Sequence, residues 1–184
     1  MKSFWPKAPS PRRSVRTAVL LLALAGSLSA CNAQTGIEGR DDLQIGSGRT
    51  APPLSGPLVG GGEFSLVGKT GHPVVVDFWG SWCGPCRQEQ PDINALYEQY
   101  AARGVVFVGV AMRETGTAGI TAYQRELGVR YPSISDDGAR SSDWSVAAPP
   151  TLVLVDGTGH VAKSYLGTVA GLSAALDRLL SAKA

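Results

Sequence analysis

Two cysteines, Cys83 and Cys86, carry the clearest chemistry in this chain, because they lie three residues apart and can form and break one disulfide within a helical turn. They lie in the sequence WCGPC at 82–86, between an apolar run at 74–79 that predicts a strand and a segment at 87–100 that predicts a helix. A cysteine at a helix N-terminus faces unpaired backbone N–H groups and the positive end of the helix dipole, which favour the thiolate. The pattern therefore predicts thiol–disulfide exchange, with Cys83 as the attacking sulfur and Cys86 as the resolving sulfur.

Two other interpretations of this cysteine pair exist: half of a structural zinc site, or two buried and unreactive thiols. A zinc site needs two further ligands, often a second cysteine pair or two closely spaced histidines. The remaining cysteine is Cys31, and the two histidines, His72 and His160, lie 88 residues apart. The sequence therefore favours a redox pair over a metal site, and we expect neither a metal ion nor another cofactor.

The first 30 residues have the features of an export signal rather than of a folded domain. Five basic residues accompany an apolar run at 17–26, which is too short to span a bilayer as a folded helix. The sequence LSAC that ends at Cys31 resembles a bacterial lipobox, in which Cys31 would be lipidated. The alternative is an ordinary signal peptide that happens to precede a cysteine. Arg12-Arg13 leaves twin-arginine export open beside general secretion.

A lipidated Cys31 would anchor the protein to a bacterial membrane and place its domain outside the cytoplasm, where disulfides persist. Residues 31–50 are polar and lack apolar periodicity, which predicts a flexible tether, whereas residues 51–184 are long enough for one domain with a core. Without the five basic residues of the first 30, the chain has 12 Lys and Arg against 15 Asp and Glu, a net charge of −3. This charge gives no indication of nucleic-acid binding.

Hydrophobic patterning in residues 51–184 predicts alternating strands and helices. Short apolar segments at 58–59 and 64–66 flank Gly60-Gly61-Gly62, which predicts a β-hairpin. The run at 105–112 is continuously apolar, as in a strand of a parallel sheet with helices on its faces. The remaining predictions are helices at 87–103, 120–127 and 170–182, a loop with one helical turn at 136–144, and strands at 151–155 and 161–166.

Several of these segments together resemble thioredoxin-like proteins, and in particular the extracytoplasmic, membrane-anchored TlpA/ResA type. The segment FWGSWCGPCRQEQP at 78–91 is similar to the active-site segment of this family, and 150–156 is similar to its cis-proline strand. The first hairpin and 71–76 resemble its N-terminal extension, so that the resemblance covers residues 51–181. It implies an α/β fold of the thioredoxin-like class, with a central mixed β-sheet flanked by helices and an N-terminal β-hairpin extension.

The resemblance also implies roles for Asp77 and Pro150. Asp77 lies six residues before Cys83, where cytoplasmic thioredoxins have a buried acid under the disulfide. A carboxyl within this apolar strand should be buried with a raised pKa and should take the proton of Cys86, although a structural role is the alternative. Pro150 matches the proline that follows a cis peptide bond. Pro149 departs from the family pattern, because it has no N–H to offer to a bound peptide.

The implied function is that of a thiol–disulfide oxidoreductase outside the cytoplasmic membrane. Gly84 and Pro85 resemble the residues between the cysteines of reducing thioredoxins, which favours reduction of exported proteins, among them apocytochrome c. A membrane thiol transporter would supply the electrons, and we expect a monomer. The alternatives are an oxidase that forms disulfides in secreted proteins and, in another class, a copper carrier that uses the same cysteines. The expected substrate-binding residues are Trp82, Gly84, Pro85, Pro149 and Pro150.

Overall fold

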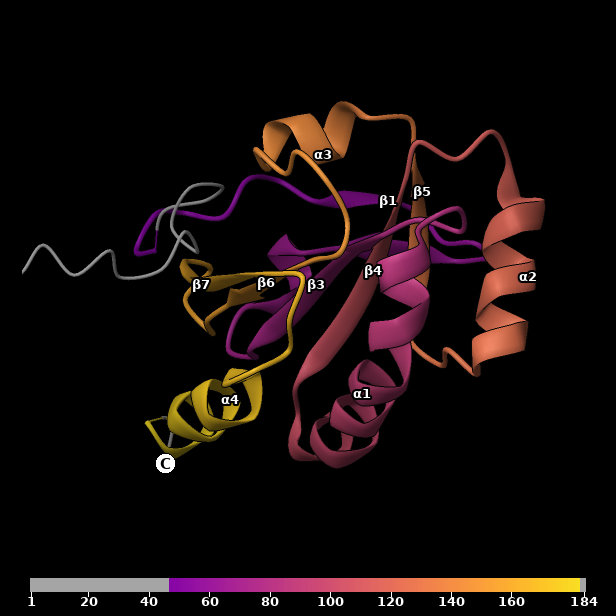
Figure 1. The fold of residues 1–184 in the computed structure, drawn as a ribbon. Coiled ribbons are helices and arrows are strands. Elements are labelled where there is room, and N and C mark those ends of the chain that lie inside the picture. Colours follow the sequence, from indigo (N-terminus) through magenta and orange to yellow (C-terminus); the bar gives the residue numbers. More distant parts are fainter. Residues whose placement is uncertain (1–46, 183–184) are drawn as a thin grey trace, which may run out of the picture. The chain divides into compact units, whose positions relative to one another are not determined.

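The computed structural model describes residues 47–182, so the expected leader at 1–30, most of the expected tether at 31–50 and Cys31 lie outside the described residues. Within 47–182 no helix is both long and apolar enough to cross a membrane. The elements shown in Figure 1 are β1 (Ser55–Pro57), β2 (Glu63–Ser65), β3 (Val74–Trp79), α1 (Gly84–Tyr100), β4 (Val106–Met112), α2 (Thr117–Leu127), β5 (Ser133–Asp136), α3 (Ala139–Asp143), β6 (Thr151–Val155), β7 (Val161–Leu166) and α4 (Leu172–Ser181).

A five-stranded mixed sheet in the order β5-β4-β3-β6-β7 forms the centre of the domain. Strands β3, β4 and β5 are parallel, whereas β6 is antiparallel to both β3 and β7. All six residues of β3 are buried, as the continuous apolar run predicts for a central strand. The register places Thr151, the first residue of β6, opposite Phe78 near the end of β3. The segment before β6 therefore lies at the end of the sheet where β3 leads to the cysteines.

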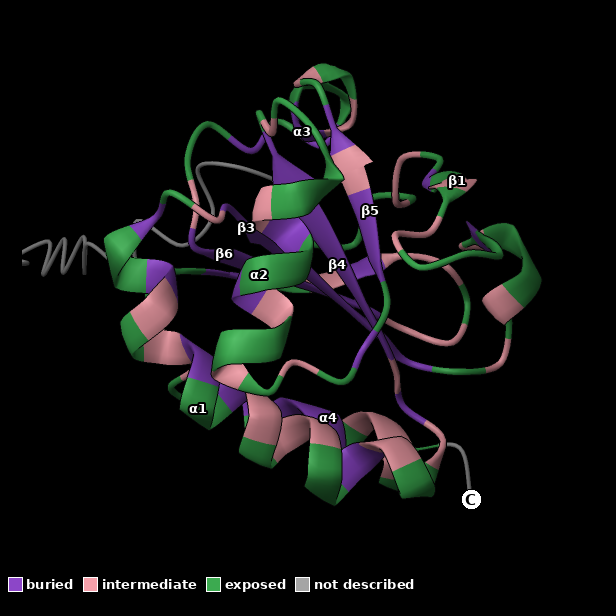
Figure 2. Ribbon diagram, turned by 90° about the vertical axis from the view of Figure 1, so that its right-hand side faces the viewer, coloured by how far each residue is buried: buried purple, intermediate pink, exposed green. Residues whose placement is uncertain are grey.

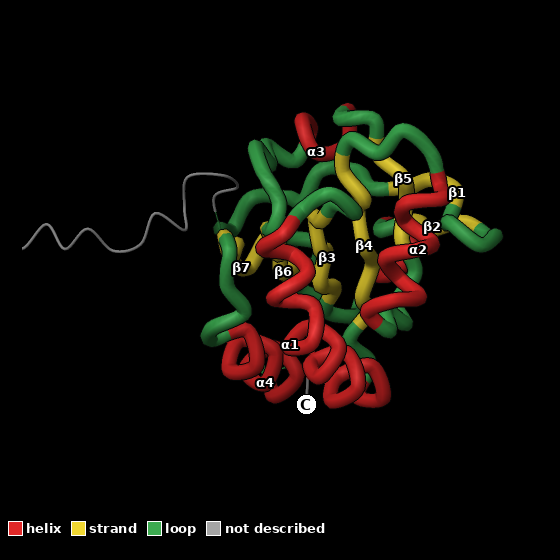
Figure 3. The backbone as a smooth tube through the Cα atoms, turned by 45° about the vertical axis from the view of Figure 1, so that its right-hand side comes forward, coloured by secondary structure: helices red, strands yellow, loops and turns green. Residues whose placement is uncertain are grey.

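Helices α1, α2 and α4 cover one face of the sheet, and Figure 3 shows them in front of the strands. Side chains alternate along β3, so Val75 packs with residues of α1 and α4, and Trp79 packs with Tyr123 of α2. On the opposite face, Phe64 of the hairpin and Trp144 after α3 belong to a second apolar core. Figure 2 shows the strands buried between these layers, with the outer faces of the helices exposed.

Helix α1 begins at Gly84, three residues earlier than the predicted helix, so that Cys83 is its N-cap residue. The helix is followed by a 3-10 turn at Ala101–Arg103, which Gly104 closes with φ 89°. Glycine suits this left-handed conformation because it has no Cβ atom. The earlier start brings both cysteines into the first turn of the helix, which strengthens the interpretation made from the sequence.

The predicted N-terminal hairpin is confirmed, although its first strand is Ser55–Pro57 rather than 58–59. The sequence pattern missed one strand of the central sheet, β5, which pairs in parallel with β4. Its sequence SISD contains a single apolar residue, Ile134, and shows no strand pattern of useful length. Pairing with the neighbouring strand, rather than local preference, therefore determines β5.

The backbone before residue 51 also pairs with the domain. The N–H of Gly48 donates to the C=O of Val161 at 2.7 Å, and the N–H of Val161 donates to the C=O of Arg49 at 2.8 Å. Thr50 forms an antiparallel bridge with His160. Residues 48–50 therefore lie along the start of β7, which is the last strand of the sheet.

Candidate active site

Cys83 and Cys86 form a disulfide, with their Cα atoms 5.3 Å apart, and both are buried. The backbone N–H of Cys86 donates to Sγ of Cys83 at 3.2 Å, and Pro85 occupies the first turn of α1. In the reduced protein the same N–H and the helix dipole would stabilise a thiolate at Cys83. Pro85 suits this position because the first helical residues have no intrahelical partner for their N–H groups. The geometry thus supports Cys83 as the attacking sulfur.

Trp82 is exposed beside the attacking sulfur, with 54% of its surface accessible. Its ring is held in place, because Nε1 donates to the C=O of Met112 at 3.1 Å. Gly80 makes this position possible, since a Cβ there would lie 2.8 Å from the Trp82 ring. A large aromatic surface is therefore presented next to Cys83 in a fixed orientation, as expected for a substrate contact.

Glu114 holds the loop that leads to Cys83. Its carboxylate accepts hydrogen bonds from both the N–H and the hydroxyl of Ser81, at 2.6 Å and 2.9 Å. Gly119 leaves room for this contact, because a Cβ at that position would lie 2.8 Å from Oγ of Ser81. The sequence gives no signal for these hydrogen bonds, since Ser81 and Glu114 are 33 residues apart and share no motif.

Asp77 is buried within the central strand, as predicted, and its pKa is raised to about 7. Burial is the main cause, because a carboxylate loses its hydration there, and the nearby charge of Glu89 raises the pKa further. A hydrogen bond from the Tyr131 hydroxyl to Oδ2, at 2.6 Å, acts in the opposite direction. Oδ1 has no hydrogen-bond partner among the described residues. Such a carboxyl can exchange a proton near neutral pH.

A chain of buried hydrogen bonds connects Asp77 to the helix that carries the cysteines. Nε2 of Gln90 donates to the Tyr131 hydroxyl at 2.9 Å, and the Tyr123 hydroxyl donates to Oε1 of Gln90 at 3.2 Å. Gln90 lies four residues after Cys86 and therefore on the same face of α1. Burial and the neighbouring Asp77 raise the pKa of Tyr131 well above its ordinary value, so the phenol stays a hydrogen-bond donor.

Glu89 and Arg87, which follow the cysteines on α1, have different surroundings. Both carboxylate oxygens of Glu89 are buried without a hydrogen-bond partner among the described residues. Its pKa is raised, chiefly by burial and then by the charge of Asp92. Arg87 instead pairs with Glu126, and its guanidinium lies 5.4 Å from the centre of the Tyr123 ring. The Glu89 carboxyl is therefore a second buried acid close enough to influence Asp77.

The peptide bond between Pro149 and Pro150 is cis, as predicted. Pro150 is buried, and its C=O accepts a hydrogen bond from the N–H of Gly167 at 3.0 Å. The residue that follows, Thr151, donates from its hydroxyl to the C=O of Ala148 at 2.8 Å. These bonds hold the backbone of this segment at the end of the sheet where β3 leads to Cys83.

The fold thus brings most of the predicted residues to one end of the inner strands β3 and β6. Cys83, Cys86 and Trp82 lie at the start of α1, Asp77 lies in β3 beneath that helix, and the cis-proline segment precedes β6. Cys31 lies outside the described residues. The residues that the sequence analysis missed are Ser81, Gln90, Glu114, Tyr123 and Tyr131.

Comparison with known proteins agrees with this geometry. The Redoxin family matches residues 46–179. The thiol-disulfide oxidoreductase ResA of Geobacillus thermodenitrificans is 31% identical over 161 residues, covering 86% of this chain and 89% of that protein. ResA of Bacillus anthracis is 29% identical over 150 residues, covering 81% of this chain and 85% of that protein.

Among solved structures, a thiol:disulfide interchange protein of the thioredoxin family from Chlorobium tepidum superposes with a TM-score of 0.64 at 28% identity. The match covers 72% of this chain and 96% of that one. The family match and the relative named as a thiol-disulfide oxidoreductase are both consistent with the Cys83–Cys86 disulfide at the start of α1. The chain therefore belongs to the Redoxin family and is a thioredoxin-like thiol–disulfide oxidoreductase of the ResA type.

Proposed function

We propose that this protein reduces disulfides of exported proteins outside the cytoplasmic membrane, with Cys83 attacking, Cys86 resolving and Asp77 exchanging protons. The observation that carries the proposal is the position of Cys83 at the N-cap of α1, where the N–H of Cys86 lies 3.2 Å from its Sγ. The buried Asp77, with a pKa of about 7, supplies the second half of the chemistry. Apocytochrome c is the first substrate to test.

The reaction starts from the reduced protein. The Cys83 thiolate attacks one sulfur of a substrate disulfide, which forms a mixed disulfide and releases the other substrate sulfur as a thiolate that takes up a proton. Cys86 gives its proton to Asp77 and attacks Sγ of Cys83, which releases the second substrate thiolate. The substrate disulfide gains two electrons, and the two protein thiols lose them as the Cys83–Cys86 disulfide forms. A membrane thiol transporter then returns two electrons to the protein.

The proton step suits the environment of Asp77. A carboxyl whose pKa is about 7 is close to half ionised at neutral pH, so it can both accept and return a proton. The Tyr131 hydroxyl stabilises the ionised form through its hydrogen bond to Oδ2. Without that bond, burial and the charge of Glu89 would leave the pKa of Asp77 higher than it is.

Substrate binding is proposed to use the exposed surface around the disulfide. Trp82 provides an aromatic contact, and Gly84 and Pro85 leave the first turn of α1 accessible. Backbone at Pro149 and Pro150 would pair with the substrate chain, but Pro149 can offer only its C=O. Binding at this residue should therefore depend on a single backbone hydrogen bond instead of two.

Attachment to the membrane is proposed to occur through a lipid on Cys31, with the domain at 51–184 held by residues 31–50. Metabolic labelling with a fatty acid tests this directly. Wild-type protein should incorporate the label and sediment with membranes, whereas Cys31→Ala should lose both properties. Equal labelling of the variant would exclude Cys31 as the site of attachment.

The direction of electron flow is tested by the reduction potential of the Cys83–Cys86 couple, measured by equilibration with glutathione or dithiothreitol buffers. A reductase should have a potential near that of thioredoxin, about −270 mV, whereas an oxidase would approach the value of DsbA, about −120 mV. A value near −120 mV would contradict the proposed direction. Cys86→Ser, which cannot form the internal disulfide, is the matched control.

A further inference from the structure

A cavity of about 340 Å³, open to solvent, lies between α3 and the segment that leads to the cis peptide bond. Its lining combines Arg113, which follows β4, with Ser141 and Ser142 of α3. Ser145 and Ala147, in the chain after α3, also line the cavity. The described residues that line it include one cation and no acidic side chain.

A short series of contacts connects this cavity with the redox pair. Trp82, next to Cys83, donates from Nε1 to the C=O of Met112 at 3.1 Å, and Arg113 is the next residue along the chain. Nη2 of Arg113 donates to the C=O of Ala147 at 3.3 Å, three residues before Pro150. The guanidinium thus links the segment after β4, which contacts Trp82, to the segment before the cis peptide bond.

The charge of Arg113 is not neutralised within the described part of the chain. No ion pair among residues 47–182 includes Arg113. The adjacent Glu114 uses both of its oxygens on Ser81. Asp136, which precedes α3, is fully buried, and its two oxygens accept from the N–H groups of Arg140 and Ser141. The Ser141 hydroxyl already donates to the C=O of Gly138 at 3.1 Å, so the hydroxyls beside the guanidinium that can serve a ligand are those of Ser142 and Ser145. An exposed guanidinium beside these hydroxyls matches a carboxylate in both charge and hydrogen-bond donors.

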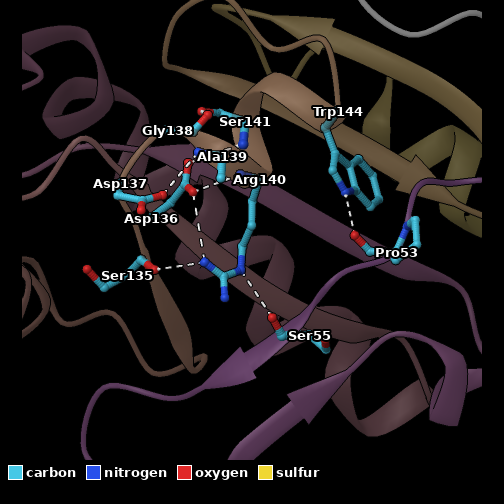
Figure 4. Close-up of polar contacts among 10 residues, drawn as sticks. All are labelled: Pro53, Ser55, Ser135, Asp136, Asp137, Gly138, Ala139, Arg140, Ser141 and Trp144. Atoms are coloured by element: carbon cyan, nitrogen blue, oxygen red, sulfur yellow. Dashed lines mark hydrogen bonds and ion pairs between the residues drawn. The ribbon is translucent and has the colours of Figure 1, made fainter.

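Backbone conformation and hydrogen bonds hold the segments around the cavity. Within residues 47–182, Arg113 and Ser145 are the two residues other than glycine with positive φ, at 53° and 52°. Such strained conformations concentrate at functional sites, where the surrounding structure holds them. Figure 4 shows how α3 is tied down: Nε of Arg140 donates to the C=O of Ser55 at 3.1 Å, and Nε1 of Trp144 donates to the C=O of Pro53 at 3.3 Å.

We propose that this cavity is a subsite for an Asp or Glu side chain of the substrate protein, close in sequence to the cysteine that Cys83 attacks, with Arg113 binding its carboxylate. The inference rests on the proposed reduction of protein disulfides. It assigns a specificity to that reaction: among substrates of equal disulfide chemistry, the acidic one is reduced faster. Arg113 is a binding residue in this account and takes no part in the transfer of electrons.

The test uses reduced full-length protein and a panel of disulfide-linked peptides with blocked ends. Each peptide carries one Glu or one Gln at a position up to four residues from the cysteine, and the second-order rate constant of disulfide reduction is measured. We expect Glu to exceed Gln by about fivefold at one or two adjacent positions at low salt, and by less at high salt. Arg113→Gln should bring this ratio to about one. Arg178→Gln, an exposed residue of α4 with the same change in charge, should leave it unchanged.

The outcomes separate the subsite from the reaction itself. Equal rates for Glu and Gln peptides at every position, or a preference that persists in Arg113→Gln, would overturn the subsite while leaving the reductase intact. A preference lost equally in Arg178→Gln would assign it to overall charge instead and would also overturn the subsite. Failure to reduce any peptide, neutral ones included, would overturn the proposed function. A peptide with a free C-terminal carboxylate and no Glu distinguishes side-chain recognition, which predicts no gain, from recognition of a chain end.

Discussion

On the face of β3 that meets the N-terminal hairpin, Val76 and Phe78 pack in an apolar core, where the buried N–H of Trp144 has a hydrogen-bond partner. On the face beneath α1 and α2, the alternating residues are Asp77 and Trp79, and polar atoms without partners gather there. Oδ1 of Asp77 and Nε1 of Trp79 have no hydrogen-bond partner among the described residues, and the same is true of the Glu89 carboxylate. One strand therefore has an apolar face and, beneath α1 and α2, a polar layer in which buried atoms lack hydrogen-bond partners.

The difference between the two faces shows where this fold gives up stability. Each buried polar atom without a partner destabilises the folded state, because it has lost its hydrogen bonds to water. Here those atoms lie on the side of the sheet that carries Cys83 and Cys86, and not on the side of the hairpin. The proposed proton exchange between Asp77 and Cys86 would take place in this layer.

Truncation on the apolar face should have the largest effect on stability. Phe78→Ala removes a fully buried ring that packs on Trp144 with 5.7 Å between ring centroids, and it should lower the free energy of unfolding by about 3–5 kcal/mol. Urea unfolding measures this change, and Phe78→Leu should lose much less. A loss below about 1 kcal/mol for Phe78→Ala would mean that the apolar face does not carry the stability of the sheet.

Substitution of Asp77 on the polar face should raise the free energy of unfolding rather than lower it. The pKa of Asp77 is about 7 in the folded protein and 3.8 when unperturbed, so the folded state binds the proton more tightly. The resulting stability is fully present below pH 3.8 and is lost as the pH rises through 7, a difference on the order of 4 kcal/mol. Asp77→Asn cannot ionise, so at pH 8 it should be more stable than wild type by about 2–4 kcal/mol.

The pH dependence distinguishes this explanation from a general gain in packing. The advantage of Asp77→Asn should shrink to near zero by pH 4, where the wild-type carboxyl is protonated. Unfolding free energies at several pH values provide the measurement. An advantage that is the same at pH 4 and pH 8 would show that the ionisation of Asp77 is not its source. The variant should also resolve mixed disulfides more slowly while forming them at an unchanged rate.

Removal of the hydrogen bond from Tyr131 should change the free energy of unfolding least. Tyr131→Phe removes the donor to Oδ2 of Asp77, so the pKa of Asp77 should rise above its wild-type value of about 7. The stability should fall by about 1 kcal/mol, because Gln90 also loses a partner. Titration of the Asp77 carboxyl by NMR measures the pKa directly. A pKa that falls in Tyr131→Phe would contradict the proposed role of this bond.

The sequence was informative where the chemistry is local. The continuous apolar run of β3 and the cysteines at the start of α1 predicted the central strand and the nucleophile, and the matching proline motif implied the cis bond. The short polar strand β5 was missed because its pairing with β4 is a tertiary effect. The bond from Tyr131 to Asp77 spans 54 residues and leaves no pattern in the chain. The burial of the Glu89 carboxylate leaves no signal in the sequence either, because its neighbours on the helix are polar.

Trapping of the mixed disulfide tests the central claim most directly. Reduced full-length Cys86→Ser and Cys83→Ser are each incubated with a disulfide-bearing peptide, and covalent adducts are located by mass spectrometry. Cys86→Ser should accumulate a stable adduct on Cys83, because the resolving sulfur is missing. Cys83→Ser, which keeps Cys31 and Cys86, should form little adduct at neutral pH. An adduct on Cys86 that forms as fast as the one on Cys83 would contradict the assignment of the nucleophile and the mechanism built on it.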